Sequence, residues 1–165
     1  MGGAVGLTGD ENGKPVIIRA AVADIGSALH CVIGIFAALR VRDKSGKGQH
    51  IDVSMTDSVL PFLTVSLLRY LKDGFVPERG YKTLSLNVWE TQDGKYLATG
   101  LIEPHFWERF CIAIGRKDLI PYHHAKGADL ERVYEIIQRV LLTKKRDDWV
   151  GIFRAADTCV SPVLD

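Results

Sequence analysis

The longest apolar stretch of the chain runs over residues 25–39 and is interrupted only by Ser27 and His30. The apolar side chains of such a run must be removed from water by packing against other parts of a protein. The run is also shorter than the roughly 20 residues that a bilayer span requires. We therefore predict a buried helix over residues 24–42. Asp24 stands at its front, where a carboxylate accepts from the free N–H groups of the first turn, so we expect it to cap the helix.

The residues on either side of this helix follow other patterns. The first 18 residues are rich in glycine and have no helical or strand period, which predicts a loop. Residues 43–48 have the composition of a turn, and residues 49–54 alternate as in a short strand. Apolar residues at helical spacing over 56–71 predict a second buried helix, with Pro61 close to its start.

Residues 72–82 contain glycine, proline and charged residues, so we place a linker at 73–82 between domains 1–72 and 83–165. Beyond the linker, two alternating runs meet across Asp93 and Gly94, a strong hairpin signal. Helical patterns follow over residues 104–115, 129–142 and 144–156. The second half is therefore expected to be α+β.

Charge and cysteine content narrow the class of partner. With 21 basic and 20 acidic residues, the chain has no electrostatic bias toward nucleic acid or an anionic membrane. We read residues 144–146 as a solvated helix start.

The three cysteines, Cys31, Cys111 and Cys159, are odd in number and lie in apolar surroundings, which indicates reduced core thiols. The first residues lack the pattern of a signal peptide. We expect a cytoplasmic protein that binds neither nucleic acid nor membrane.

Two acidic residues are candidates for chemistry. Asp24 has small neighbours that allow close approach of a ligand, and its carboxylate could be a nucleophile or a proton carrier. Glu103 precedes Pro104 at another helix start, where an acidic side chain complements the helix dipole. Taken alone, both patterns are also those of ordinary structural residues. His30 is expected to be a satisfied core histidine.

A metal site is not expected. His123 and His124 are adjacent, so their rings should point apart, and the chain lacks the spacing and the third ligand of a zinc site.

Four blocks of the sequence, at residues 2–9, 22–26, 46–54 and 89–106, resemble CoA-transferase family III in order and spacing. This group, also called CaiB/BaiF, includes CoA transferases and acyl-CoA racemases, and residues 158–163 are similar to its small-domain exit. The resemblance implies an α/β fold, in which the second part of a large Rossmann-like domain is followed by a small α+β domain.

The resemblance also implies the chemistry of Asp24. In the transferases this aspartate becomes a mixed anhydride and then an aspartyl-CoA thioester, whereas in the 2-methylacyl-CoA racemases it exchanges the α-proton. The segment around Glu103 is similar to the racemase block, where the matching glutamate belongs to the active-site region. The implied substrates are coenzyme A thioesters and small carboxylic acids, without a metal. CoA-binding residues cannot be assigned.

Members of the family are much longer than this chain. Their N-terminal half binds CoA, and in racemases it supplies a histidine partner to the aspartate. This part is absent here, so we expect the isolated chain to be inactive. The full-length form is expected to be an interlocked homodimer. The alternative is a noncatalytic fragment or assembly module of such an enzyme.

Overall fold

The structure, a computed structural model, describes residues 3–10, 13–76 and 82–164. It divides into two compact units, Met1–Tyr81 and Lys82–Asp165, called unit 1 and unit 2 below. Unit 1 contains α1 (Ala4–Leu7), α2 (Val22–Ser45), η1 (Asp57–Leu63) and α3 (Thr64–Asp73). Unit 2 contains β1 (Leu86–Glu90), β2 (Tyr96–Gly100), α4 (Pro104–Ala113), η2 (Lys117–Tyr122), α5 (Gly127–Leu141), α6 (Arg146–Ala155) and β3 (Val160–Pro162).

The division falls near the predicted linker. The first two residues of the 72–82 segment belong to α3, and Gly74 ends that helix with a φ of 72°. Residues 77–81 of the linker lie outside the described part of the chain. The assignment of residues 1–72 and 83–165 to the large and the small domain of a longer enzyme stays a prediction.

The predicted long helix is confirmed as α2, but its cap is not. The N-cap is Ala21, which makes no side-chain hydrogen bond, and Asp24 lies inside the first turn. An acidic residue there complements the helix dipole without capping. The helix ends at Gly46, whose left-handed backbone (φ 72°) lets its N–H donate to the Arg42 carbonyl over 2.7 Å.

Burial of α2 was predicted wrongly, because Gly26 is its only buried residue within unit 1. Apolar residues surround the helix on all sides, so covering it requires neighbours all round. The exposed large apolar residues of α2 are Ile25, Leu29, Val32, Ile33, Ile35, Phe36, Leu39 and Val41.

The length of α2 also exceeds the expectation. It has 24 residues, and its most apolar 18-residue stretch has a mean hydropathy of 1.9. By length and composition alone, such a helix can cross a membrane, but core helices of soluble proteins pass the same test. The expectation that the chain binds no membrane therefore stays a prediction.

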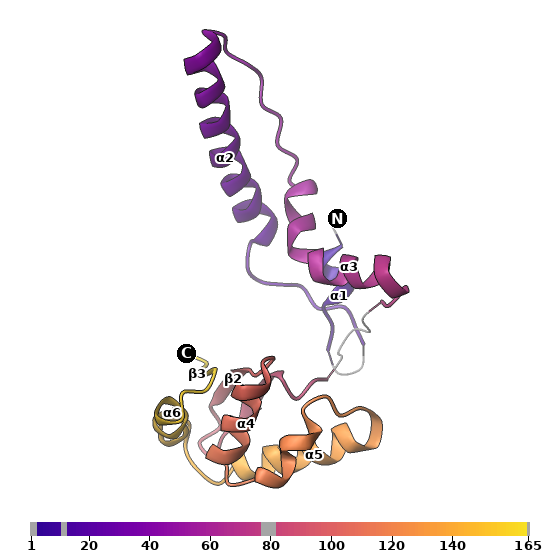
Figure 1. Cartoon of the computed structure of the whole chain (residues 1–165), viewed down its shortest axis with the longest axis vertical. Coiled ribbons are helices and arrows are strands. Elements are labelled where there is room, and N and C mark those ends of the chain that lie inside the picture. Colours follow the sequence, from indigo (N-terminus) through magenta and orange to yellow (C-terminus); the bar gives the residue numbers. More distant parts are fainter. Residues whose placement is uncertain (1–2, 11–12, 77–81, 165) are drawn as a thin grey trace. The chain divides into compact units, whose positions relative to one another are not determined.

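The segment between α2 and η1 runs back along the helix in extended form (Figure 1). It packs closely, since a Cβ placed on Gly34 would lie 3.1 Å from Ile51 Cγ2. The strand predicted over 49–54 is nevertheless wrong, because these residues form no ladder. A strand needs a neighbour that accepts and donates its backbone hydrogen bonds, and the described part of unit 1 provides none.

The second predicted helix is divided into η1 and α3. Pro61 lies inside η1 and has no N–H to donate to a preceding carbonyl, so the hydrogen-bond ladder is interrupted there. The regular α-helix begins only at Thr64. The prediction of burial was also wrong, since only Ser58 and Val59 of these two elements are buried. Unit 1 thus leaves most of its apolar side chains exposed.

The glycine-rich opening is not entirely loop. It contains the one-turn helix α1 and a bridge between Gly9 and Pro15. Gly3 precedes α1 with a φ of 87°, and a Cβ on it would lie 2.9 Å from Leu63 Cδ1. Only glycine allows both this backbone conformation and this close approach.

Unit 2 has a three-stranded antiparallel sheet in the order β1-β2-β3. The hairpin across Asp93 and Gly94 is confirmed, and Val88 pairs with Ala98 in its register. The helices α4, α5 and α6 confirm the three predicted helices to within a few residues. They cover a core that contains all three tryptophans; its largest buried side chains include Trp89, Trp107, Trp149, Phe110 and Phe153.

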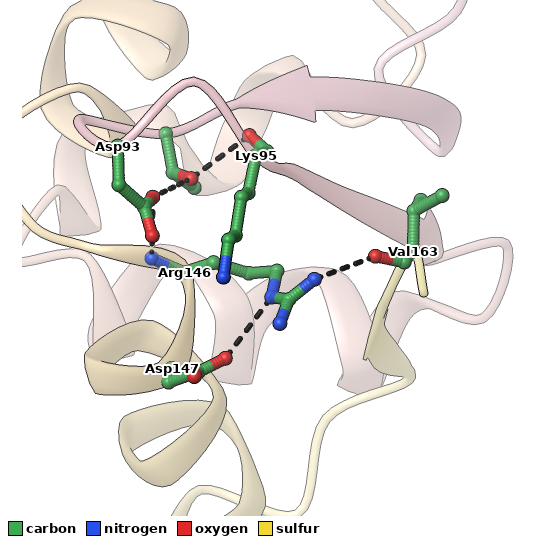
Figure 2. A network of polar contacts seen from close by, with 6 residues as sticks. Asp93, Lys95, Arg146, Asp147 and Val163 are labelled. Atoms are coloured by element: carbon green, nitrogen blue, oxygen red, sulfur yellow. Dashed lines mark hydrogen bonds and ion pairs between the residues drawn. The ribbon is translucent and has the colours of Figure 1, made fainter. Parts of the chain in front are cut away.

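A polar network joins the hairpin turn, the start of α6 and the end of the chain (Figure 2). The Asp93 carboxylate accepts from the Thr91 hydroxyl over 2.7 Å and from the Arg146 backbone N–H over 3.0 Å. The Arg146 guanidinium donates to the Val163 carbonyl over 2.8 Å and to Asp147 over 3.0 Å. Arg146 is only 8% exposed, so the expectation of a solvated segment at 144–146 is wrong for this residue.

Unit 2 should lose stability in acid through Asp93. The hydrogen bond from Thr91, and then that from Arg146, lower the pKa of Asp93 below its ordinary value. The folded state therefore holds this proton less tightly than the unfolded chain, and the stabilisation is lost as pH falls through the folded pKa. Urea unfolding followed by tryptophan fluorescence should show Asp93→Asn destabilising the protein at neutral pH and progressively less in acid, whereas Asp148→Asn should not. A pH-independent effect of Asp93→Asn would contradict this.

The cysteines differ in reactivity. Cys111 is buried, whereas Cys31 and Cys159 are exposed, so the expectation of core thiols holds only for Cys111. Burial, and then the charge of Asp118, raise the pKa of the Cys111 thiol to about 12. Because the thiolate is the reactive form, iodoacetamide near pH ~8 should alkylate Cys159 and spare Cys111 until the protein is denatured. Peptide mass spectrometry measures this, and alkylation of both thiols at equal rates would contradict it.

Candidate active site

Asp24 lies in the first turn of α2 with its side chain exposed. Its backbone carbonyl accepts a hydrogen bond from the Ser27 hydroxyl over 3.0 Å. Within the described ranges, no hydrogen bond or ion pair involves the Asp24 carboxylate. Within unit 1 the carboxylate is therefore accessible.

Asp24 borders a hollow of about 270 Å³. Small side chains form most of its wall, and Arg19 is its only other charged lining residue; the wall consists of Ala4, Val5, Ile18, Arg19, Ala20, Ala21, Val22, Ala23, Asp24 and Val59. Arg19 is not predicted from the sequence, because only the hollow that both residues line with α1 and η1 relates it to Asp24. A guanidinium can hold a carboxylate ligand through paired hydrogen bonds.

The start of α2 also presents backbone donors beside this carboxylate. The N–H groups of Ala23 and Asp24 have no partner inside the helix because they belong to its first turn. No backbone carbonyl of the described residues accepts from them. Such groups stabilise negative charge, so this end of the helix can support an anionic intermediate.

The position of Asp24 depends on the contact between α2 and η1. A Cβ placed on Gly26 would lie 3.3 Å from both Phe62 Cε2 and the Ser58 carbonyl oxygen. Glycine therefore allows the first turns of α2 to lie directly on η1. One turn further along, His30 Nδ1 lies 2.8 Å from the Gly26 carbonyl, which can only accept, so His30 donates from Nδ1. It is hydrogen-bonded as expected, but it is half-buried and does not belong to the core.

Glu103 is the N-cap of α4 in unit 2. Its backbone carbonyl accepts from the N–H groups of Phe106 and Trp107 over 3.0 Å and 3.2 Å. Its side chain is exposed and makes no cap hydrogen bond. Asp24 belongs to unit 1 and Glu103 to unit 2, and a catalytic role for either stays a prediction.

The two adjacent histidines do not point apart as expected. The rings of His123 and His124 stack with centroids 4.2 Å apart. Among residues 3–10, 13–76 and 82–164, no three His, Cys, Asp or Glu side chains gather closely enough to hold a metal ion.

The whole chain, residues 1–165, matches the sequence pattern described as CoA-transferase family III. The chain belongs to CoA-transferase family III. A formyl-CoA:oxalate CoA-transferase of Escherichia coli O157:H7 (strain EC4115) is 30% identical over 194 residues, covering 99% of this chain and 46% of the relative. The enzyme of the same name from Escherichia coli O139:H28 is 29% identical, and the alignment again covers 99% of this chain and 46% of the relative.

Solved structures agree with this assignment. A CAIB/BAIF family protein from Brucella suis has a TM-score of 0.74 and 26% identity, covering 100% of this chain and 46% of that one. Rv3272 from M. tuberculosis has a TM-score of 0.77 at 22% identity, covering 99% and 45%, and supports the fold alone. The family and the mixed α/β fold, matching part of the family's structures, are thus confirmed.

This chain is shorter than its relatives in two ways. It spans about half the length of the curated relatives that it matches. Within the matched region, 194 aligned residues against a chain of 165 leave at least 29 residues of the relative opposite gaps. The family III chain therefore lacks some internal segment that the transferase has.

Proposed function

We propose that the protein containing this chain transfers coenzyme A between carboxylic acids, with Asp24 as the acyl carrier. The observation that carries the proposal is the state of the Asp24 carboxylate, which is exposed, unpaired and beside a hollow with a small-residue wall. A nucleophilic carboxylate has to be accessible and not engaged with a cation. Membership of the family and the transferase names of the relatives support the same reaction.

The proposed reaction has four steps, in which Asp24 alternates between two acyl forms. Its carboxylate attacks the donor thioester carbonyl, expelling CoA thiolate and forming a mixed anhydride. The thiolate attacks the Asp24 carbonyl, which releases the donor acid and forms an aspartyl thioester. The acceptor carboxylate then displaces the thiolate to give a second anhydride. The thiolate finally attacks the acceptor carbonyl, which yields the new thioester and restores Asp24.

Residues around Asp24 fit the charges that develop in these steps. The first-turn N–H groups of Ala23 and Asp24 would stabilise the oxyanion at the Asp24 carbonyl. Arg19, on the wall of the same hollow, would hold the carboxylate of the acceptor acid. We also propose a catalytic role for Glu103, which the similarity of its segment to the racemase block implies. We further propose that the full-length enzyme is a cytoplasmic homodimer.

Racemisation of 2-methylacyl-CoA is the second candidate. It is favoured by the similarity of residues 100–106 to the racemase block and by the internal shortening relative to the transferase. In a racemase, Asp24 would remove and return the α-proton of the thioester, and no acyl bond to the protein would form.

One incubation separates the two reactions. The full-length gene product is mixed with a 2-methylacyl-CoA and a second carboxylic acid in deuterated water. Transfer predicts the thioester of the second acid, with no deuterium at the α-carbon of the donor. Deuterium at the α-carbon without the new thioester would overturn transfer in favour of racemisation. Absence of both would favour a noncatalytic assembly module, for which the exposed apolar surface of α2 is the supporting observation.

A further inference from the structure

The turn that carries Glu103 is held from three separate parts of unit 2. The Gly100 N–H donates to the Cys159 carbonyl over 2.8 Å, and the Leu101 N–H donates to the Ser85 carbonyl over 2.7 Å. His123 Nε2 lies 2.7 Å from the Leu101 carbonyl oxygen. The Leu101 side chain is 0% exposed. Two residues before Glu103, the backbone is therefore fixed on both its donor and its acceptor side.

The His123 ring is packed against two neighbouring rings. It stacks on Trp107 with centroids 5.4 Å apart and planes 12° from parallel, and it also stacks on His124. Trp107 is buried and donates from Nε1 to the Ile120 carbonyl over 3.0 Å. Because the Leu101 carbonyl can only accept, His123 carries a hydrogen on Nε2.

His123 contacts both sides of the Glu103 turn. Before the turn, the His123 ring donates a hydrogen bond to the Leu101 carbonyl; after the turn, it stacks on the Trp107 ring. The backbone N–H of Trp107 in turn donates to the Glu103 carbonyl. The other two bonds to residues 100–101 are between backbone atoms, so His123 supplies the side-chain bond to this segment among the described residues. Since the Glu103 side chain makes no cap bond of its own, the direction of its carboxylate depends on this backbone.

We propose that His123 is a positioning residue, which fixes the backbone around Glu103 and so holds the Glu103 carboxylate where its proposed catalytic role requires it. The inference rests on the proposed function, because it assumes the catalytic role of Glu103. His123 lies after residues 89–106, the block of sequence whose resemblance to the family identified Glu103. Misplacing a reacting group by about 1 Å can lower the rate by about 100-fold, so a bond that holds the turn can control the rate.

The test uses two amides of different reach in the full-length gene product. In His123→Gln the side-chain amide N–H can occupy the position of His Nε2 and still reach the Leu101 carbonyl. In His123→Asn the side-chain amide lies near the position of Nδ1 and is too far from that carbonyl to donate to it. We expect His123→Asn to lower kcat by about 10- to 100-fold with KM within about twofold, and His123→Gln to stay within about threefold of the unsubstituted protein. Lys117→Gln, a change at an exposed position at the start of η2, is the control and should leave both constants unchanged.

Hydrogen exchange of the peptide covering residues 101–107 gives a second readout. It should accelerate in His123→Asn and stay near the unsubstituted rate in His123→Gln and Lys117→Gln. Equal losses of kcat in the Asn and Gln variants, or unchanged exchange and kcat in His123→Asn, would overturn the inference while leaving CoA transfer intact. Full activity of Glu103→Gln would also overturn it. Absence of transfer in the unsubstituted protein would instead overturn the proposed function, and the inference with it.

Discussion

Asp24→Asn should abolish CoA transfer by the full-length gene product, lowering kcat by at least about 1000-fold. The amide keeps the shape of the side chain but cannot attack a thioester carbonyl or leave as a carboxylate. The Asp24 carboxylate has no hydrogen-bond or ion-pair partner among the described residues, so the change breaks no structural contact there. Activity is measured as the rate at which the acceptor thioester forms.

Asp57→Asn is the matched control. Asp57 is also an exposed aspartate in the first turn of a helical element of unit 1, η1. It does not line the hollow beside Asp24. The control should retain kcat within about twofold, as surface substitutions usually do. A residual rate in Asp24→Asn comparable to that of Asp57→Asn would contradict a covalent role of Asp24.

The 165-residue chain, purified alone, should associate strongly instead of remaining a monomer. Unit 1 exposes large apolar side chains along both α2 and α3; Phe36 is 68% exposed, and Val65 and Leu71 are 74% and 70% exposed. Burying one such side chain contributes about 1.5–3 kcal/mol, so covering several of them outweighs the cost of association. Size-exclusion chromatography with light scattering measures the state of the chain.

Charged residues on α2 should reverse this behaviour. Ile33→Glu combined with Phe36→Glu should raise the monomer fraction several-fold, because both side chains are exposed on the helix. Ile112→Glu, an exposed position of unit 2, is the control and should have little effect. The prediction would be contradicted if the unsubstituted chain were monomeric and soluble and unfolded cooperatively. The exposed apolar side chains of unit 1 would then not drive association.

Unit 2 could largely be predicted from the sequence because its signals are local. The Asp93-Gly94 turn, Pro104 at the start of α4 and the helical apolar spacing after residue 127 each depend on neighbouring residues. The three residues of β3 carry no such signal. They form a strand only because β2, about 60 residues earlier in the chain, presents a free edge.

Unit 1 was predicted less well because the described residues do not cover its apolar side chains. Apolarity indicates that α2 must be covered, but not that this chain provides the cover. The strand expected over 49–54 has the correct alternation and lacks a partner in the described part of unit 1. The cap at Asp24 failed because the helix begins earlier, at Val22, and an acidic residue is also favourable inside the first turn.

The candidate site was predicted only as single residues. Asp24 and Glu103 follow from their blocks of sequence, whereas Arg19 and His123 become relevant only through tertiary contacts. Arg19 lines the hollow together with residues of α1, η1 and the start of α2. His123 reaches the Glu103 turn because η2 returns the chain to it, 22 residues after Leu101.

Hydroxylamine trapping tests the acyl-carrier role of Asp24 most directly. Trypsin releases residues 20–40 as one peptide, in which Asp24 is the only acidic residue. Its mass therefore reports modification of this carboxylate without ambiguity. The full-length gene product, incubated with a CoA thioester and hydroxylamine, should give the hydroxamate on this peptide, and should not do so without the thioester. A peptide that stays unmodified while CoA transfer proceeds would contradict the account.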